Sequence, residues 1–273
     1  MEKKNKKMIC PLVLLITVLM FANACKKEES KITPKTTTVI TWDTPADIRY
    51  GTLLTATQLN ATANIPGTFV YTPDLYTKLD VGPNQDLRVD FKPTDSLTYS
   101  SESKIVKINV YIIIGDNYKG GKLAYVFLPS DPGYVENQFH GLVAAPTNQS
   151  SSVVWDYPST FGFYQTTGAI ATELGTGNQN TITIISVNGV GTYAAVLCSS
   201  LSLGGYGDWY MPSKAELNIL YRNKTMIGGF DNKGYWSSSE YGNAEAWRQS
   251  FASGAQSIVA KETLLSLRAI RSF

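Results

Sequence analysis

The sequence predicts a multidomain protein in which a β-sandwich is followed by an α+β domain. Between residues 39 and 112, apolar and polar residues alternate with a period of two, and Pro and Gly separate the runs. From about Gly115 onward the chain is richer in Gly, Ser, Asn and Trp, which marks a boundary. In this second segment a helix-start signal at Ser213 stands among short strand-like runs. A chain of 273 residues is long enough for two domains of ordinary size.

The first 24 residues have the pattern of a signal peptide. A lysine-rich start precedes the apolar run Met8–Phe21, which is short for a helix that spans a membrane. Small residues and Cys25 follow, and this arrangement resembles a lipoprotein signal peptide with cleavage before Cys25 and lipid attached to that cysteine. An ordinary cleaved secretory peptide is the alternative.

The segment 25–38 is polar and contains Pro, so we expect a flexible tether. Its charged run Lys26–Glu29 resembles the signal that sends lipoproteins to the outer surface in one Gram-negative phylum; a plain solvated charge run is the alternative. The expected location is therefore the outer membrane, lipid-anchored and facing the cell exterior, with the membrane itself as one partner.

Charge, cysteine and histidine contents exclude several classes of function. The net charge of +2 does not indicate a nucleic-acid partner, which would need clustered cations. With Cys10 in the leader and Cys25 lipidated, Cys198 stands alone, so no intrachain disulfide is expected. Cys198 lies on an apolar helical face and is predicted to be a core thiol rather than a nucleophile. His140 is the only histidine, which excludes a multi-histidine metal site, and we expect no metal and no cofactor.

The first domain, residues 39–112, is predicted from its alternating runs. Leu87, Val89 and Phe91 alternate with charged residues, and the run 106–112 repeats the pattern. Such runs with turn residues between them are typical of a β-sandwich of about 75 residues. The stretches ITWDTPADIRYGTLL, LNATANIPGTFVYTP and VDFKPTDSLTYSS resemble a bacterial Ig-like adhesin module. The resemblance implies a spacer, with Trp42 and Phe69 in its core.

The second domain is predicted to mix helices and strands. Ser213 and Glu216 form a capping-box pattern at the start of a short helix. The other expected elements are strands at 123–128, 142–145, 235–236, 246–251 and 264–273, helices at 180–185 and 193–201, and a polar loop at 237–240. The segment Gly175–Asn178 lacks the spacing and the Lys-Ser/Thr of a phosphate-binding loop.

Motifs along residues 115–273 resemble a family of unknown function. They are HGLVAA, GTGNQNT, DWYMPSKAELNILY, YWSSSE, AWRQSF and LRAIR, in this order. The family is the Lcl C-terminal-like family, named after the C-terminal region of a collagen-like bacterial adhesin that binds sulfated polysaccharide. The resemblance implies an α+β fold related to the C-type lectins and the formylglycine-generating enzymes, with small antiparallel sheets and long loops.

Departures from these relatives limit what the resemblance implies. Formylglycine-generating enzymes use two cysteines, whereas this domain has only Cys198. The stretches EYGNAEAW and WRQSF stand where lectins carry calcium ligands. Ten Lys and Arg residues against eleven Asp and Glu residues in 115–273 argue against a strong polyanion site. Neither the oxidation chemistry nor calcium-mediated sugar binding is therefore expected.

The candidate ligand-binding residues cluster in the stretch 208–247. Tryptophan side chains there form either an aromatic platform for a sugar ring or part of the core, and the serine run is the preferred ligand surface. The candidates are Trp209, Trp236, Ser237, Ser238, Ser239, Glu240 and Trp247. Asp208 and Glu240 are interpreted as partners of Arg268 and Arg271 in structural ion pairs; an acid pair for glycoside cleavage is the alternative.

These observations predict a cell-surface lipoprotein with a non-enzymatic binding or adhesion role and a glycan or extracellular-matrix ligand. No catalytic residue is assigned. The alternatives are an extracytoplasmic carbohydrate-active enzyme and a structural subunit of a surface fibre.

Overall fold

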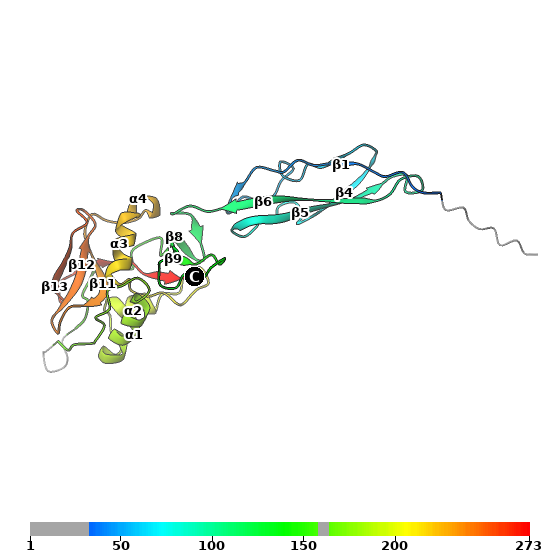
Figure 1. Cartoon of the computed structure of the whole chain (residues 1–273). Helices are drawn as coiled ribbons and strands as arrows, with labels where there is room; N and C mark the ends of the chain where they lie inside the picture. The colour runs from blue at the N-terminus through cyan, green and yellow to red at the C-terminus, as the bar shows by residue number, and fades with distance from the viewer. Residues whose placement is uncertain (1–32, 158–163) are drawn as a thin grey trace, which may run out of the picture.

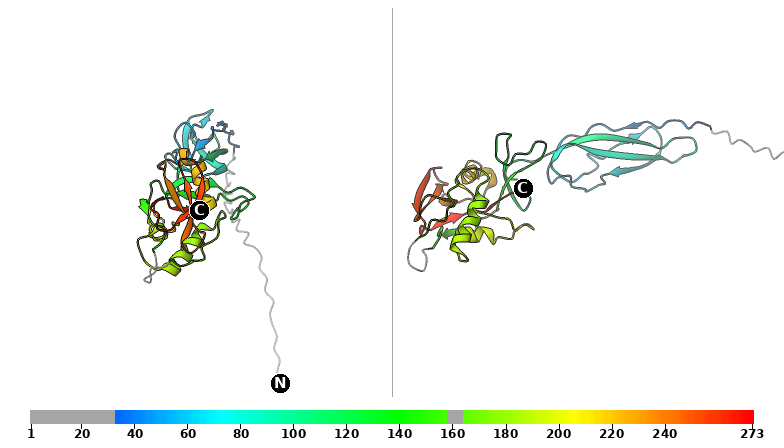
Figure 2. Two further views of the ribbon diagram at one scale, coloured as in Figure 1. Left: turned by 90° about the vertical axis from the view of Figure 1, so that its left-hand side faces the viewer. Right: turned by 60° about the horizontal axis from the view of Figure 1, so that its bottom comes forward.

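The computed structural model describes residues 33–157 and 164–273, and the chain is β-rich and multidomain. The leader, the lipidation site Cys25 and most of the tether lie outside the described residues. An N-terminal part, residues 33–112, and a C-terminal part, residues 113–273 as far as described, lie end to end (Figure 1), and the right-hand view of Figure 2 shows the same arrangement. No helix in the described ranges is long and apolar enough to cross a membrane.

The N-terminal part is built from two sheets without helices in its described residues. The larger sheet has the order β2-β6-β5-β4, and the smaller pairs β1 with β3. The strands are β1 (Ile40–Thr41), β2 (Ile48–Arg49), β3 (Thr62–Ala63), β4 (Gly67–Thr72), β5 (Gly82–Pro93) and β6 (Glu102–Tyr111). Every second residue is buried from Leu87 onward in β5 and from Val106 to Val110 in β6, because successive side chains of a strand point to opposite faces.

The core of the N-terminal part lies between its large sheet and the chain segment before β4. Leu87, Val106 and Ile108 from the sheet pack with Trp42 and Leu54 from that segment. The Trp42 indole N–H donates to the Gln58 carbonyl at 3.0 Å, so its only polar atom is satisfied inside the core. The sequence-based expectation of a buried Trp42 is confirmed.

The first residues of the N-terminal part run parallel to β6. Thr36 forms a parallel bridge with Tyr99, just before β6 begins. Further along, β2 pairs in parallel with the end of β6, with Ile48 opposite Val110. The chain therefore enters this part beside the start of β6 and leaves it at the end of β6, at the opposite end of the sheet (Figure 1).

The C-terminal part contains two further sheets. One has the order β10-β14-β11-β12-β13, and the other has the order β15-β9-β8-β7. The strands are β7 (Asn117–Tyr118), β8 (Gly121–Val126), β9 (Gly141–Ala144), β10 (Ser150–Val153), β11 (Gly234–Glu240), β12 (Glu245–Ser250), β13 (Gln256–Ala260), β14 (Leu265–Leu267) and β15 (Ile270–Ser272). Because β14 and β15 are separated by only two residues, the end of the chain ties the two sheets together.

Four helices are present among the described residues: α1 (Gly177–Asn188), α2 (Ala194–Ser199), α3 (Lys214–Arg222) and α4 (Lys224–Ile227). Helices α1 and α3 pack against β11, and α3 also packs against β12. The predicted capping box at the start of α3 is confirmed: the Ser213 hydroxyl accepts from the Glu216 N–H at 3.2 Å, and the Glu216 carboxylate accepts from the Ser213 N–H at 2.7 Å.

The contacts between the two parts include an ion pair and an aromatic contact. Arg49, at the end of β2, donates through Nε to the Asp116 carboxylate at 2.9 Å. The rings of Tyr50 and Tyr118 lie edge to face at 5.2 Å. The Arg49 guanidinium lowers the pKa of Asp116, which keeps this carboxylate charged. The junction therefore has specific contacts as well as covalent continuity.

Candidate functional site

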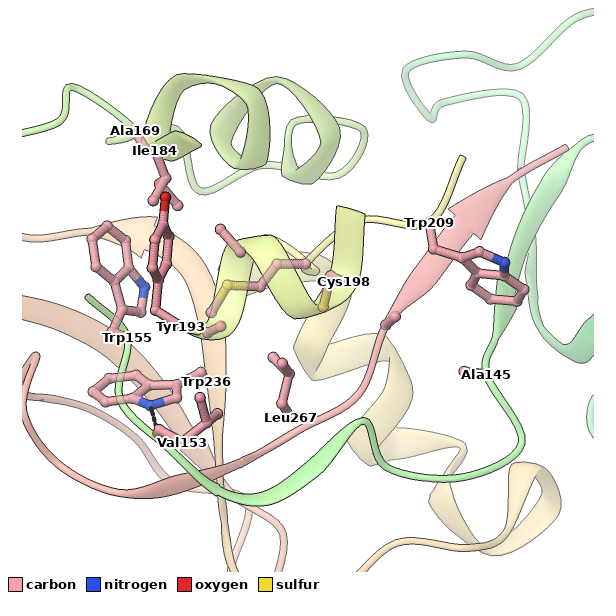
Figure 3. Packing of buried hydrophobic residues seen from close by; sticks show 14 of the residues in the cluster. Ala145, Val153, Trp155, Ala169, Ile184, Tyr193, Cys198, Trp209, Trp236 and Leu267 are labelled. Atoms are coloured by element: carbon pink, nitrogen blue, oxygen red, sulfur yellow. Dashed lines mark hydrogen bonds between the residues drawn. The ribbon is translucent and has the colours of Figure 1, made fainter. Parts of the chain in front are cut away.

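Two of the three candidate tryptophans belong to the core. Trp209 and Trp236 are 2% and 0% exposed. Their indole N–H groups donate to the carbonyls of Tyr206 at 3.2 Å and Val153 at 2.9 Å. Figure 3 shows Trp236 bonded to Val153 and packed beside Trp155. Buried rings with satisfied N–H groups have no face open to a ligand, so Trp209 and Trp236 belong to the core, the alternative to the aromatic platform, and their place among the ligand-binding candidates is wrong. Truncation of such a side chain costs about 3–5 kcal/mol of stability.

The three candidate serines are also buried, and they form a strand rather than the expected loop. Ser237, Ser238 and Ser239 lie in β11 and are at most 1% exposed. The Ser239 hydroxyl donates to the Ala171 carbonyl at 2.7 Å and accepts from the Lys214 N–H at 3.0 Å. The Ser237 hydroxyl donates to the Trp247 carbonyl, and Ser238 Oγ accepts from the Asn180 amide. These hydroxyls hold neighbouring segments together and are closed to a ligand.

Glu240 forms a buried ion pair, and its partner is Lys261 instead of the predicted arginines. The Lys261 ammonium donates to Glu240 Oε1 at 2.6 Å, and both side chains are 0% exposed. The carboxylate also accepts from the backbone N–H groups of Thr167 and Gly168 at 2.8–2.9 Å. The ammonium lies 4.6 Å from the centre of the Trp155 ring. With all its acceptor sites used and no solvent access, Glu240 has no role in binding ligand.

The other carboxylate in this set, Asp208, pairs with Arg271. Arg271 Nη2 donates to Asp208 Oδ2 at 2.8 Å, and its guanidinium lies 3.9 Å from the centre of the Tyr206 ring. The pair lowers the pKa of Asp208. The Asp208 side chain is 56% exposed, whereas the carboxylate of Glu240 is fully buried. Glu240 has no exposed surface through which it could reach a substrate, and this does not favour the two acids as a catalytic pair.

Arg268 is a buried arginine held by carbonyl oxygens. It donates to the carbonyl of Ala145 at 2.8 Å and to Asn148 Oδ1 at 2.9 Å, and its guanidinium lies over the Phe230 ring. Burial lowers its pKa to about 10. No carboxylate in the described ranges lies within ion-pair distance of Arg268, so its assignment to an ion pair with Asp208 or Glu240 is wrong.

The remaining reactive groups are engaged in structural contacts. Cys198 is 0% exposed, and burial raises the pKa of its thiol far above the ordinary value. The ring nitrogens of His140 lie 2.9 Å from the Phe273 carbonyl and 2.7 Å from Gln138 Oε1. Glu216 is buried in the capping box, and burial raises its pKa. No cluster of potential metal ligands occurs in residues 33–157 and 164–273.

Trp247 is the one candidate residue that reaches the surface as an aromatic side chain. It lies on β12 and is half-buried, and the neighbouring Tyr241 is 58% exposed. The two rings meet edge to face at 6.0 Å, and the Lys214 ammonium lies 3.4 Å from the centre of the indole. We call these three residues the Trp247 surface. An amphipathic ring with an adjacent cation suits a hydroxyl-rich ligand.

Sequence reasoning missed two members of the Trp247 surface. Tyr241 follows directly after the serine run, and Lys214 begins α3. The only local signal for Tyr241 is an aromatic residue in a Gly- and Asn-containing turn. Nothing local indicates that Lys214 reaches Trp247, because their contact depends on how α3 packs over β12. A ligand that stacks on the Lys214-covered face of the indole must displace this ammonium, at a cost of about 0.5–1 kcal/mol.

Comparison with known proteins places the chain in no family. No protein-family model and no curated protein matches it. Among solved structures, it is similar to a fimbrial protein from Bacteroides ovatus ATCC 8483, with 12% identity and a TM-score of 0.39, over 85% of this chain and 70% of that chain. A likeness this remote carries no conclusion about function, and the Lcl C-terminal-like resemblance stays an expectation.

Proposed function

We propose that the chain is a lipid-anchored protein of the outer cell surface that binds a glycan or matrix ligand without catalysis. In this proposal Cys25 carries the lipid and the tether ends before Thr36, because Thr36 and Thr38 are bonded into the N-terminal part. The N-terminal part is an Ig-like spacer, and the C-terminal part is a binding head with a C-type-lectin-like fold of the Lcl C-terminal-like family.

The path of the chain through the N-terminal part carries this proposal. The chain enters beside the start of β6 and leaves from its end, so this part adds its full length between residue 33 and the head (Figure 1). Strand β5 alone has 12 residues, which span about 40 Å at the usual rise per residue. A domain whose N-terminal and C-terminal connections lie at the same end would add little distance between the anchor and the head. The through-path supports a spacer that holds the head away from its anchor.

The burial and bonding of the potentially reactive side chains support a binding function over a catalytic one. Glu240 and Glu216 are buried and bonded, Cys198 is sealed in the core, and Asp208 is committed to Arg271. A catalytic group must reach its substrate with a suitable proton affinity. These side chains instead hold the fold, which is the pattern of a scaffold for surface recognition.

The Trp247 surface is the proposed ligand contact of the head, and a binding screen tests it. The full chain is applied to a glycan array and to immobilised matrix proteins, beside Trp247→Ala and Tyr241→Ala. We expect the variants to lose most of the signal, because an exposed aromatic contact contributes about 1 kcal/mol or more to binding. The control is Tyr76→Ala, which removes a 72% exposed aromatic ring from the N-terminal part. If a ligand binds the parent chain and all three variants equally well, the Trp247 surface is not its contact.

Two further experiments separate this function from its alternatives. Cys25→Ser should release the chain from the membrane fraction; retention of the variant would contradict the lipid anchor. Turnover of a glycan by the purified chain would favour the enzyme. Failure to bind any ligand, combined with incorporation of the chain into a surface polymer, would favour the structural fibre subunit.

A further inference from the structure

A cavity of about 620 Å³ lies at the junction of the two parts. The N-terminal part contributes the start of β5 and the end of β6, and the C-terminal part contributes a loop before β9. Its lining residues are Val81, Gly82, Pro83, Asn109, Val110, Tyr111, Asn137, Gln138 and Phe139. This volume falls within the roughly 300–1,000 Å³ of typical small-molecule sites. No sequence motif pointed to this place, because its two walls are far apart along the chain.

The walls of the cavity are apolar and aromatic. Tyr111 is 50% exposed, so its ring is open to an incoming molecule. Phe139 is half-buried, and its ring packs against two others. The centre of its ring lies 5.6 Å from that of Tyr118 and 5.4 Å from that of Phe273. Val81 and Val110 complete the apolar surface. The aromatic wall on the head side is therefore rigid before any ligand arrives.

The polar groups of the cavity are neutral carboxamides. Asn109 is held by the Asp47 carboxylate at 3.0 Å and by the Asn84 N–H at 2.8 Å. Gln138 contacts His140 through one end of its amide, which leaves the other end free to bond. The Asn137 side chain forms no hydrogen bond within the described part of the chain. A carboxamide offers both a donor and an acceptor, which matches a hydroxyl group.

We propose that this cavity binds a neutral carbohydrate residue, with Tyr111 and Phe139 against its C–H face and the amides of Asn137 and Gln138 on its hydroxyls. The lining contains no Asp, Glu, Lys or Arg. A charged sugar would lose its hydration there without a compensating partner, whereas a neutral sugar would not. The inference rests on the proposed binding function, but it names a second site and a ligand class for it.

The test measures binding of neutral sugars to the full chain in detergent micelles. Titration calorimetry and saturation-transfer NMR are run with methyl glucoside, methyl mannoside, N-acetylglucosamine and cellobiose, and with glucuronate as the charged comparison. Two variants spare the core: Tyr111→Ala removes an exposed ring, and Asn137→Gly removes an amide at a position with φ of 61°, which glycine tolerates. We expect each to weaken binding about tenfold, and Tyr76→Ala, which removes an exposed ring that does not line the cavity, to leave it unchanged.

Each result decides the inference. Neutral-sugar binding that is lost in Tyr111→Ala and Asn137→Gly and kept in Tyr76→Ala supports the cavity. Binding that is indifferent to both cavity variants, or equally strong for glucuronate, overturns it. If no neutral sugar binds while the Trp247 surface still captures a matrix protein, the cavity inference fails and the proposed function stands. If neither surface binds anything, both fail.

Discussion

Replacement of Glu240 by Gln should strongly destabilise the C-terminal part. The substitution removes the charge that neutralises the Lys261 ammonium, which is 0% exposed. That ammonium would keep only neutral partners at its site, which are the Gln165 carbonyl at 3.1 Å, the face of Trp155 and the amide oxygen of the new Gln side chain. An unpaired charge left in a protein interior costs about 3–5 kcal/mol. We expect about 4 kcal/mol for Glu240→Gln.

The opposite variant, Lys261→Met, should cost less. The Glu240 carboxylate would keep the N–H groups of Thr167 and Gly168, so it remains better solvated by the protein than the orphaned ammonium. We expect Lys261→Met to cost about 3 kcal/mol. The double variant should cost about 4 kcal/mol, which is less than the sum of the two single variants, because it leaves no unpaired charge buried. The double-mutant cycle then gives about 3 kcal/mol of coupling.

Urea unfolding followed by tryptophan fluorescence measures these changes. Four of the five tryptophans lie in the C-terminal part, so the signal reports mainly on that part. At about 2 kcal/mol per M of urea, a loss of 4 kcal/mol lowers the midpoint by about 2 M. Glu245→Gln, which alters an exposed carboxylate on β12, is the control and should change stability by less than about 0.5 kcal/mol. Single variants as mild as this control, or a cycle without coupling, would refute the reasoning.

Three other predictions concern separate contacts. Asp208, whose pKa Arg271 lowers from 3.8, contributes stability that is present above that ordinary value and lost as pH falls through the lowered one. Asp208→Asn should therefore reduce the loss of unfolding free energy at low pH, measured from urea midpoints, by less than about 1 kcal/mol, because the carboxylate is 56% exposed. A pH dependence equal to that of the parent would contradict the pair. Cys198 should react with a thiol reagent only after unfolding, since it is fully buried; rapid labelling of the folded chain would show an open core. Gly177→Ala should lower the stability by about 1–3 kcal/mol, because a Cβ there collides with Glu216 and with backbone oxygen; a stability equal to that of the parent would contradict this packing.

Sequence patterns predicted the elements that depend on near neighbours. The alternation of Leu87 and Val89 specifies which face of β5 is buried, and the structure places both in the core. The capping box needs only Ser213 and Glu216, three residues apart, so its signal is complete in the sequence. These features require no knowledge of the rest of the fold.

The interior of the C-terminal part was not predictable in the same way. A run of three serines reads as a loop, but in β11 each hydroxyl is bonded to a partner that other segments supply. Strand β11 is covered on both faces, with Tyr235 in one core cluster and Trp236 in another. No local pattern distinguishes such a strand from a polar turn. The partner of Glu240 likewise depends on where the chain after β13 brings Lys261.

The parallel course of residues 36–49 and β6 has a mechanical consequence. If the chain is held near residue 33 while the head is pulled, the tension acts along both segments and in opposite directions. The bonds at the two ends of the pairing, from the Thr36 N–H to the Thr98 carbonyl at 2.8 Å and from the Tyr50 N–H to the Tyr111 carbonyl at 2.7 Å, would then be sheared together. Hydrogen bonds loaded in shear carry the force together and must break together. Hydrogen bonds loaded in an unzipping geometry break one after another. A pull between residue 33 and the head therefore loads this region of the N-terminal part in shear.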